Sequence, residues 1–394
     1  MVLESVFCES SDGRLWASPP IDNTFWEHYL DIFDEVVIIA RLRRVSQASG
    51  QSELNRSRLS IGSVPDYQGP WQFIRSLRPT NDSIRNSVRD CDAIIARVPS
   101  ALSLVALPHI LAESRPLALE VVGHPEDVFA NTDTGGLLAP VYQQVFGKSL
   151  RWMCERADCV SYVTERYLQQ SYPPGRDAVT THYSDVELGL EDLAESPRLE
   201  FAEIPVRLLS VGSLNQLYKG PDVLLDALAF VRKSLDVDLT WVGGGRHIEA
   251  MRSRCTDLDL GESVRFVGPV SGRASVQAYL DAAAILVMPS RTEGLPRAII
   301  EGMARGLPCI GTNVGGVPEL LSDDVLVPPD DPEALADKII ELAGSPERLV
   351  HLSQRNLQEA RRYLREHLEP RRRKFYETLR QVAESRIILS NRDA

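Results

Sequence analysis

Glu293 and Glu301 are the two carboxylates of this chain best spaced for chemistry, eight positions apart around a Gly-Leu-Pro turn. The apolar run 284–288 before them predicts a buried parallel strand. We expect Thr292 or Glu293 to cap a helix whose first turn holds Pro296, because proline is favoured where a backbone N–H would go unpaired. Strand, turn and helix N-terminus predict an anion site at the carboxyl edge of a sheet, where carboxylates can accept hydrogen bonds from sugar hydroxyls.

The backbone of this turn would supply the hydrogen-bond donors of the site. The N–H groups that would face a ligand are those of Gly294, Leu295 and the neighbours of Pro296. A surface interpretation competes with this one, because Arg297, Glu301 and Arg305 have the spacing of an exposed ion-pair ladder. Glu293 alone could be an acid favoured at a helix entry. The long ordered pattern, which continues to Gly-Gly-Val-Pro-Glu at 315–319, favours the binding site.

A second cluster lies in the loop between a strand that ends at Val211 and a helix that begins near Pro221. Lys219 in this loop is placed to meet a diphosphate as a flexible point charge. A departing nucleoside diphosphate gains negative charge, and without a metal a cation must stabilise it. Ser213 could add a hydroxyl donor. The alternative is that Lys219 is an exposed loop lysine without a ligand.

Composition and charge argue against a nucleic-acid-binding, disulfide-bonded, metal-dependent or membrane-spanning protein. The net charge of −12 over 394 residues argues against a nucleic-acid partner, which would require a basic face. The six cysteines include no Cys-x-x-Cys pair, which indicates reduced thiols and a cytoplasmic setting. Three Asp-x-Asp pairs, at 90–92, 236–238 and 257–259, are interpreted as solvated acids, so we expect no metal and no cofactor. With no leader pattern and no apolar run of about 18 residues, we expect a soluble protein, or at most a peripheral one on the inner face of a membrane.

Short apolar runs alternate with helical stretches, which predicts an α/β fold of two doubly wound parallel sheets. We place one domain at 1–195 and a second at 205–371, joined by an acidic linker at 188–205. The charged helical pattern after residue 346 is interrupted at Pro370. The expected strands are 2–7, 35–40, 92–96, 117–122, 159–163, 206–211, 239–242, 264–267, 285–288, 308–311 and 325–327. The expected helices are 25–33, 102–113, 137–155, 165–170, 221–234, 247–258, 276–283 and 332–343.

With these motifs the chain resembles the retaining glycosyltransferases of the GT-B fold, in the large bacterial group with a Glu-x7-Glu signature (glycosyltransferase family 4, glycosyl transferases group 1). The resemblance covers residues 205–345 well and the first two hundred residues weakly. It implies two Rossmann-like domains facing across a cleft, the first for the acceptor and the second for a nucleotide-sugar donor. The last helix, about 372–394, would cross back onto the first domain. Its basic run 371–374 could touch anionic lipid, although such a run is more often a solvated helix face.

The resemblance also implies roles for single residues. Glu293 and the amides after it would meet the transferred sugar, Glu301 would hold the ribose hydroxyls, and Lys219 would bind the diphosphate. The family pairs this lysine with an arginine, and Ser213 stands in its place.

Three further features follow from the resemblance. A second cation for the phosphates would come from elsewhere, and Arg291 or Arg297 could supply it. Gly268 closes a segment that matches the base-binding strand end. His124 follows the fourth strand and would reach across the cleft to the donor sugar, unless it is a structural loop histidine.

We therefore expect a retaining, metal-independent hexosyltransferase with Glu293, Lys219 and His124 as its catalytic residues. Its donor would be UDP-glucose or a related UDP-sugar, and its acceptor a saccharide or a lipid-linked sugar in exopolysaccharide or cell-envelope assembly. Two alternatives stay open. One is a nucleotide-sugar 2-epimerase of the same fold, and the other is a degenerate subunit that binds a sugar nucleotide without turnover, which Ser213 slightly favours.

Overall fold

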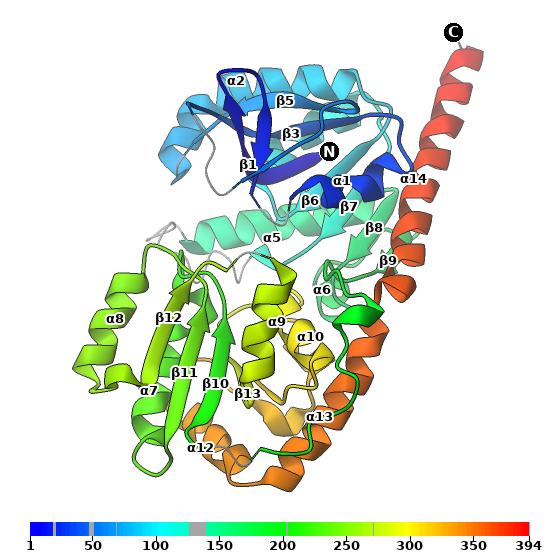
Figure 1. The fold of residues 1–394 in the computed structure, drawn as a ribbon. Helices are drawn as coiled ribbons and strands as arrows, with labels where there is room; N and C mark the ends of the chain where they lie inside the picture. Colours follow the sequence, from blue (N-terminus) through cyan, green and yellow to red (C-terminus); the bar gives the residue numbers. More distant parts are fainter. Residues whose placement is uncertain are drawn as a thin grey trace.

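The computed structural model describes residues 1–18, 21–46, 51–67, 69–125, 139–201, 204–270 and 272–393. It has two α/β lobes, one above the other, and the final helix runs along the side of the upper lobe (Figure 1). Each lobe is built around its own sheet, of which the long central part is parallel. The predicted α/β fold with two doubly wound sheets is confirmed.

The upper lobe has its first strand, β1, in the middle of the sheet. The parallel strands run in the order β5-β3-β1-β6-β7-β8-β9, and β2 with β4 forms an antiparallel extension of β1. The chain thus winds outward from β1 in both directions, as in doubly wound folds. The strands are β1 (Val2–Ser10), β2 (Leu15–Ala17), β3 (Val36–Val45), β4 (Ser52–Glu53), β5 (Leu59–Pro65), β6 (Ile94–Val98), β7 (Leu117–Val121), β8 (Cys159–Tyr162) and β9 (Val179–His182).

Two helical layers cover this sheet. One core contains buried residues of α2 (Gly69–Arg89), α3 (Ala101–Ala112) and α5 (Ala139–Arg156), so these three helices share one face of the sheet. The other face is covered by α1 (Asn23–Leu30) and α14 (Arg365–Asp393), whose Trp26, Tyr29 and Phe375 belong to the second core. Asp22 starts α1, because its side chain accepts a hydrogen bond from the N–H of Phe25.

The lower lobe holds six parallel strands in the order β12-β11-β10-β13-β14-β15. The middle strands β13 and β14 are buried at every position, as expected for a parallel sheet with helices on both faces. The strands are β10 (Val206–Val211), β11 (Val237–Val242), β12 (Val264–Gly268), β13 (Ile285–Met288), β14 (Cys309–Thr312) and β15 (Leu326–Val327). The helices are α7 (Pro221–Val231), α8 (Ile248–Asp257), α9 (Arg273–Ala282), α10 (Arg297–Ala304), α11 (Val317–Leu320), α12 (Pro332–Ala343) and α13 (Pro346–Ala360).

The final helix returns to the upper lobe. The hydroxyl of Tyr376 donates to Glu120 of β7 at 2.6 Å, and the guanidinium of Arg380 donates to the carbonyl of Ile32 at 2.5 Å. These contacts fix α14 against β7 and the segment after α1.

Several expected elements differ from the structure. Helix α10 begins at Arg297, and Pro296 immediately precedes it in an extended conformation, so neither Thr292 nor Glu293 caps that helix. Pro370 lies inside α14, and the break in the helical pattern falls earlier, at 361–364, before that helix begins. Helix α2 and strands β5 and β9 were not expected. The start of the expected helix 137–155 lies outside the described residues.

Candidate functional site

Lys219 and Glu293 meet at the carboxyl edge of the lower sheet. The Lys219 amine donates to Glu293 Oε1 at 2.6 Å, and the Ser290 hydroxyl donates to the same oxygen at 2.6 Å. Glu293 is 8% exposed. Burial acts to lower the pKa of Lys219, but the Glu293 carboxylate outweighs it and the pKa is raised, so the amine remains a cation. Lys219 and Glu293, which belong to two separate motifs of the sequence, therefore form one ion pair.

Close packing of two loops brings this pair together. Gly220 follows Lys219 with a φ of 64°, and a Cβ there would lie 2.1 Å from the carbonyl oxygen of Pro289. Arg291 joins the same loops, because its guanidinium donates to Asp222 at 2.9 and 2.8 Å. A further bond from Arg291 reaches Asp330 at 2.7 Å. Arg291 is thus occupied in positioning the loop that carries Lys219.

The turn after Glu293 touches the upper lobe. A Cβ on Gly294 would lie 2.3 Å from the carbonyl oxygen of Val122, at the end of β7, so only glycine fits this contact. Leu295 packs against both hydrophobic cores. Pro296 is buried at the start of α10. The backbone of this turn therefore lies where the two lobes meet.

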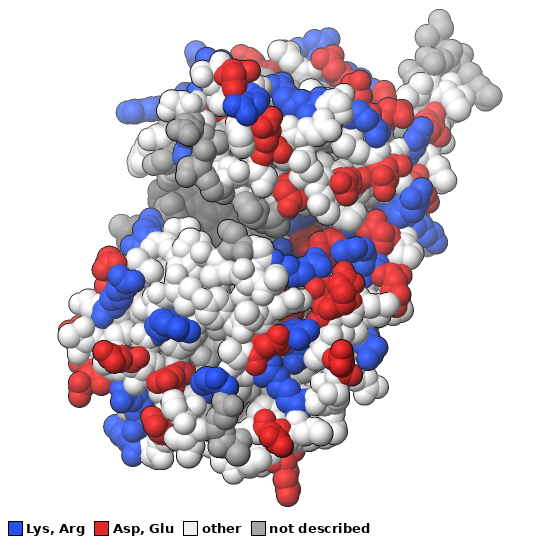
Figure 2. Space-filling view, viewed as in Figure 1, with Lys and Arg blue, Asp and Glu red and all other residues white. Residues whose placement is uncertain are grey.

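Glu301 lies on the wall of a cavity between the two lobes. This cavity has a volume of about 520 Å³ and is lined by Glu301, Arg273 and Arg297 from below and by His28 and Arg97 from above. Figure 2 shows acidic and basic side chains gathered in a hollow where the lobes meet. Burial raises the pKa of Glu301, while Arg297 and Arg273 oppose the rise. Lys219 and Glu293 are not among the residues that line this cavity, but the positive charge of Arg297 lies close enough to both Lys219 and Glu301 to oppose the raised pKa of each.

The surface-ladder interpretation of Glu301 is wrong. Arg305 forms its ion pair with Asp281, at 2.7 Å, and also donates to the carbonyl of Asp192 at 2.9 Å. Glu301 is partly buried on the cavity wall. Arg297 is exposed and also lines the cavity.

Ser213 and Gly268 lie at the strand ends of the same lobe. Ser213 is exposed, and its hydroxyl oxygen accepts a hydrogen bond from the Asn215 N–H at 3.2 Å. Gly268 ends β12 with a φ of 84°, and its carbonyl accepts a bond from the Gly243 N–H at 2.9 Å. Both positions are at the edge of the sheet that carries Lys219.

His124 lies in the upper lobe beside two tyrosines. Its ring centroid is 5.0 Å from that of Tyr172 and 5.8 Å from that of Tyr167, and the Tyr172 hydroxyl lies 3.1 Å from Nδ1. Val122, two residues earlier, is the residue that contacts Gly294. His124 is thus placed near the junction of the lobes, within an aromatic group.

Glu319 is a functional candidate that was not predicted from the sequence, although it ends the Gly-Gly-Val-Pro-Glu motif. Its carboxylate accepts hydrogen bonds from three backbone N–H groups of the upper lobe, at 2.6, 2.9 and 2.7 Å. The donors are Glu165, Arg166 and Tyr167, at the start of the short helix α6 (Tyr167–Ser171). Glu319 therefore connects the two lobes.

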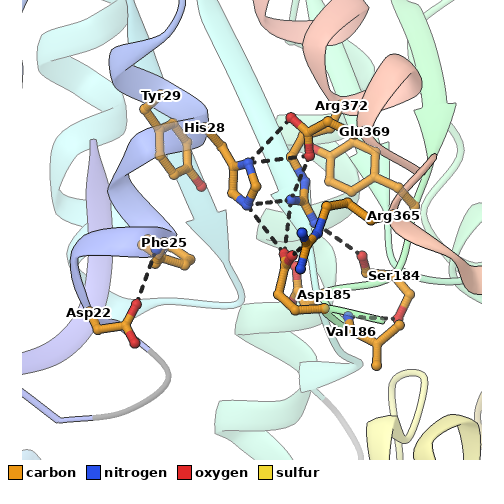
Figure 3. A network of polar contacts seen from close by, with 12 residues as sticks. Asp22, Phe25, His28, Tyr29, Ser184, Asp185, Val186, Arg365, Glu369 and Arg372 are labelled. Carbon is orange, nitrogen blue, oxygen red and sulfur yellow. Dashed lines mark hydrogen bonds and ion pairs between the residues drawn. The ribbon is translucent and has the colours of Figure 1, made fainter. Parts of the chain in front are cut away.

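A network of charged side chains above the cavity was also not predicted from the sequence (Figure 3). His28 of α1 lies 3.2 Å from Glu187 and 3.2 Å from Glu369, and Arg372 donates to both carboxylates at 3.1 and 3.2 Å. Burial opposes protonation, yet the two carboxylates raise the pKa of His28 to about 9. Arg372 is only 5% exposed, so the run 371–374 is not a continuous surface patch.

The described residues contain neither a metal-binding cluster nor a membrane-spanning helix. Within the described ranges, no group of three or more histidine, cysteine or acidic side chains is arranged to hold a metal ion. Among the helices described, none is long and apolar enough to span a membrane.

The comparisons with known proteins agree with this architecture. Residues 205–345 match the family model "Glycosyl transferases group 1". The chain is 24% identical over 317 residues to protein CapJ of Staphylococcus aureus, covering 78% of this chain and 76% of CapJ. It is 33% identical over 149 residues to the amylovoran biosynthesis glycosyltransferase AmsK of Erwinia amylovora, covering 35% of this chain and 36% of AmsK.

Solved structures share the fold across both lobes. Sucrose-phosphate synthase of Thermosynechococcus elongatus superposes with a TM-score of 0.67 at 19% identity, covering 88% of this chain and 89% of that one. Anabaena HepE, solved in complex with UDP and glucose, gives 0.64 at 17% identity, covering 97% of this chain and all (100%) of that one. Residues 205–345 therefore match the glycosyl transferases group 1 family, and the two lobes together have the GT-B fold that these solved structures share.

Proposed function

We propose that the protein is a retaining, metal-independent hexosyltransferase that uses a nucleotide diphosphate sugar, UDP-glucose or a related UDP-sugar. The acceptor would be a saccharide or a lipid-linked sugar in exopolysaccharide or cell-envelope assembly. The observation that carries the proposal is the Lys219–Glu293 pair, a cation and a carboxylate 2.6 Å apart at the carboxyl edge of the lower sheet. The names of AmsK and of the HepE complex support a sugar transfer of this class.

The pair suggests how a donor would be engaged. A donor diphosphate would draw the Lys219 amine away from Glu293, since two phosphates offer more negative charge than one carboxylate. As the bond between the anomeric carbon and the phosphate oxygen breaks, charge grows on that oxygen, and Lys219 would stabilise it. Glu293, released from its partner, would then accept hydrogen bonds from sugar hydroxyls.

The new glycosidic bond would form on the face from which the diphosphate leaves, so the product would keep the α configuration of the donor. The acceptor hydroxyl would lose its proton to the departing phosphate oxygen. Closure of the lobes would exclude water, which competes with the acceptor. Glu301 would bind the ribose from the cavity side, and His124, Ser213 and Gly268 would complete the donor site.

Isothermal titration calorimetry with UDP, GDP and ADP tests this proposal. We expect one nucleotide, UDP, to bind selectively, and Lys219→Ala to weaken its binding about 10- to 100-fold, as for a lost charge-assisted hydrogen bond. Glu301→Ala should weaken it as well. Lys338→Ala is the matched control, because Lys338 pairs with Glu341 on helix α12 of the same lobe. The proposal fails if no nucleotide binds, or if Lys219→Ala and Lys338→Ala bind alike.

A further inference from the structure

A second cavity, of about 370 Å³, lies where the helical turn η6 (Arg361–Tyr363) and the start of α14 meet the upper lobe. Helix α14 packs against β9 of that lobe, and the two lie side by side in Figure 1. This is a different cavity from the one that Glu301 lines. The charged and histidine side chains on its wall are Glu165, His182, Arg361, Arg362, His367 and Arg371.

Positive charge exceeds negative charge on the wall of this second cavity. Three arginines and one glutamate give +2 before either histidine takes up a proton, in a chain whose net charge is −12. The glutamate already has a partner, because Arg362 donates to Glu165 at 3.1 Å as well as to Glu359 at 2.6 Å. Among the described lining residues, no carboxylate is therefore left for the other two arginines.

Those two arginines, Arg361 and Arg371, are exposed and form no ion pair within the part of the chain that the structure describes. The guanidinium of Arg371 instead donates to Nε2 of His182 at 2.8 Å, so this histidine accepts as a neutral ring. Burial and the charge of Arg371 lower the pKa of His182. A guanidinium whose polar partner is another basic group lacks a counter-charge, and a bound anion would supply it.

The apolar part of the wall suits an organic group. Val163 after β8, Leu295 of the donor turn and Leu368 of α14 line the cavity beside the charged side chains. Small-molecule sites combine such apolar walls with a few polar anchors, and about 370 Å³ lies within their usual range of volume. An anion that carries a small organic part fits this combination better than a bare inorganic ion.

We propose that this second cavity binds a small phosphate ester, whose phosphate is held by Arg361 and Arg371. Guanidinium groups bind phosphate oxygens through paired hydrogen bonds, and the phosphate would replace His182 as the partner of Arg371. His182 would then take up a proton and add a further positive charge. The proposal does not depend on the donor chemistry, because neither arginine belongs to the candidate donor site.

Isothermal titration calorimetry of the full chain with sulfate and with glucose 1-phosphate tests the proposal. The ester should bind more tightly than sulfate, since it also contacts the apolar wall. Glycerol 3-phosphate, titrated in parallel, distinguishes a glycerophosphate headgroup from a sugar phosphate as the ligand. Arg361→Gln/Arg371→Gln should weaken the binding of all probes at least about tenfold. Because both side chains are exposed, this variant should melt at the wild-type temperature.

The pH dependence of sulfate binding is a second measurement. Sulfate keeps its charge between pH 6 and pH 8, so a change in its affinity reports on the protein. The charged groups around His182 are Arg371 of α14, Arg362 of η6, Glu165 before α6 and Glu319 of α11. A bound anion would favour the protonated form of this histidine. Sulfate should therefore bind several-fold more tightly at pH 6 than at pH 8, and His182→Gln should reduce this difference.

Matched variants separate this cavity from other cationic surfaces. Arg373→Gln is the control on the same helix, because Arg373 pairs with Glu377 at 2.9 Å and does not line the cavity. Lys219→Ala should still bind the probes, and UDP should bind the Arg361/Arg371 variant as it binds the wild type, so a failed donor site would show separately. The proposal is refuted if no probe binds, if the double variant binds like Arg373→Gln, or if both esters bind more weakly than sulfate. It is also refuted if Lys219→Ala abolishes the binding, which would place the anion at the donor site.

Discussion

The Lys219 amine is bonded to the Glu293 carboxylate, so a donor diphosphate would have to compete with that carboxylate for the amine. Glu293→Gln should tighten UDP binding a few-fold, because the phosphates no longer compete with a carboxylate 2.6 Å from the amine. The same variant should release UDP from UDP-glucose more slowly, since a neutral amide accepts hydrogen bonds from the sugar hydroxyls more weakly than a carboxylate. Calorimetry and a UDP-release assay measure the two effects. Glu341→Gln, which removes the partner of Lys338, is the control. Weaker UDP binding by Glu293→Gln would contradict the competition.

Glu301 should make stability depend on pH. Burial raises its pKa above the ordinary 4.5, so the folded protein holds this proton more tightly than the unfolded chain. Its contribution to stability is therefore full below pH 4.5 and is lost as pH rises through the raised value. Glu301→Gln should be more stable than the wild type at pH 8, and the difference should shrink toward pH 5. Urea unfolding at both pH values measures this, and a variant that is less stable at pH 8 would refute it.

The start of α6 depends on a side chain from the other lobe. The backbone N–H groups of Glu165, Arg166 and Tyr167 donate hydrogen bonds to the Glu319 carboxylate. Without this carboxylate, the three N–H groups would have to bond to water. Glu319→Ala should cost about 1–3 kcal/mol of unfolding free energy. Amide exchange in α6 should accelerate, while exchange in α3 stays unchanged. Mass-spectrometric hydrogen exchange checks both, and equal exchange of α6 in variant and wild type would exclude the contact.

The sequence predicted the elements that have a strong local pattern. Strands β13 and β14 are apolar at every position because both sheet faces are covered, and their expected ranges agree to within a residue. Strand β5 was missed because Ser60, Gly62 and Ser63 interrupt its apolar pattern. Helix α2 was missed because it begins with Gly-Pro, contains Pro79 and buries few apolar side chains.

The candidate site was predictable only as separate motifs. Lys219 and Glu293 are 74 residues apart, and their contact follows from the packing of two loops at the sheet edge. Glu319 bonds to residues about 150 positions away, and His28 to one 341 positions away. No local spacing encodes such contacts.

The His28 network ties the beginning, middle and end of the chain together (Figure 3). Because Glu187 and Glu369 raise the pKa of His28 to about 9, its stabilising effect is complete below pH 6.5 and is lost as pH rises through 9. His28→Gln should cost about 2 kcal/mol at pH 6 and much less at pH 9.5. Urea unfolding at the two pH values tests this, and a cost that is the same at both would show that the charge does not matter.

The measurement that tests the proposed chemistry of the whole molecule most directly is the anomer first released from the donor. With UDP-α-glucose and no acceptor, water can take the place of the acceptor hydroxyl, and proton NMR distinguishes α- from β-glucose before mutarotation. A retaining enzyme releases α-glucose first, and Lys219→Ala should suppress the release. β-Glucose as the first product would contradict retention and the same-face reaction at the Lys219–Glu293 pair.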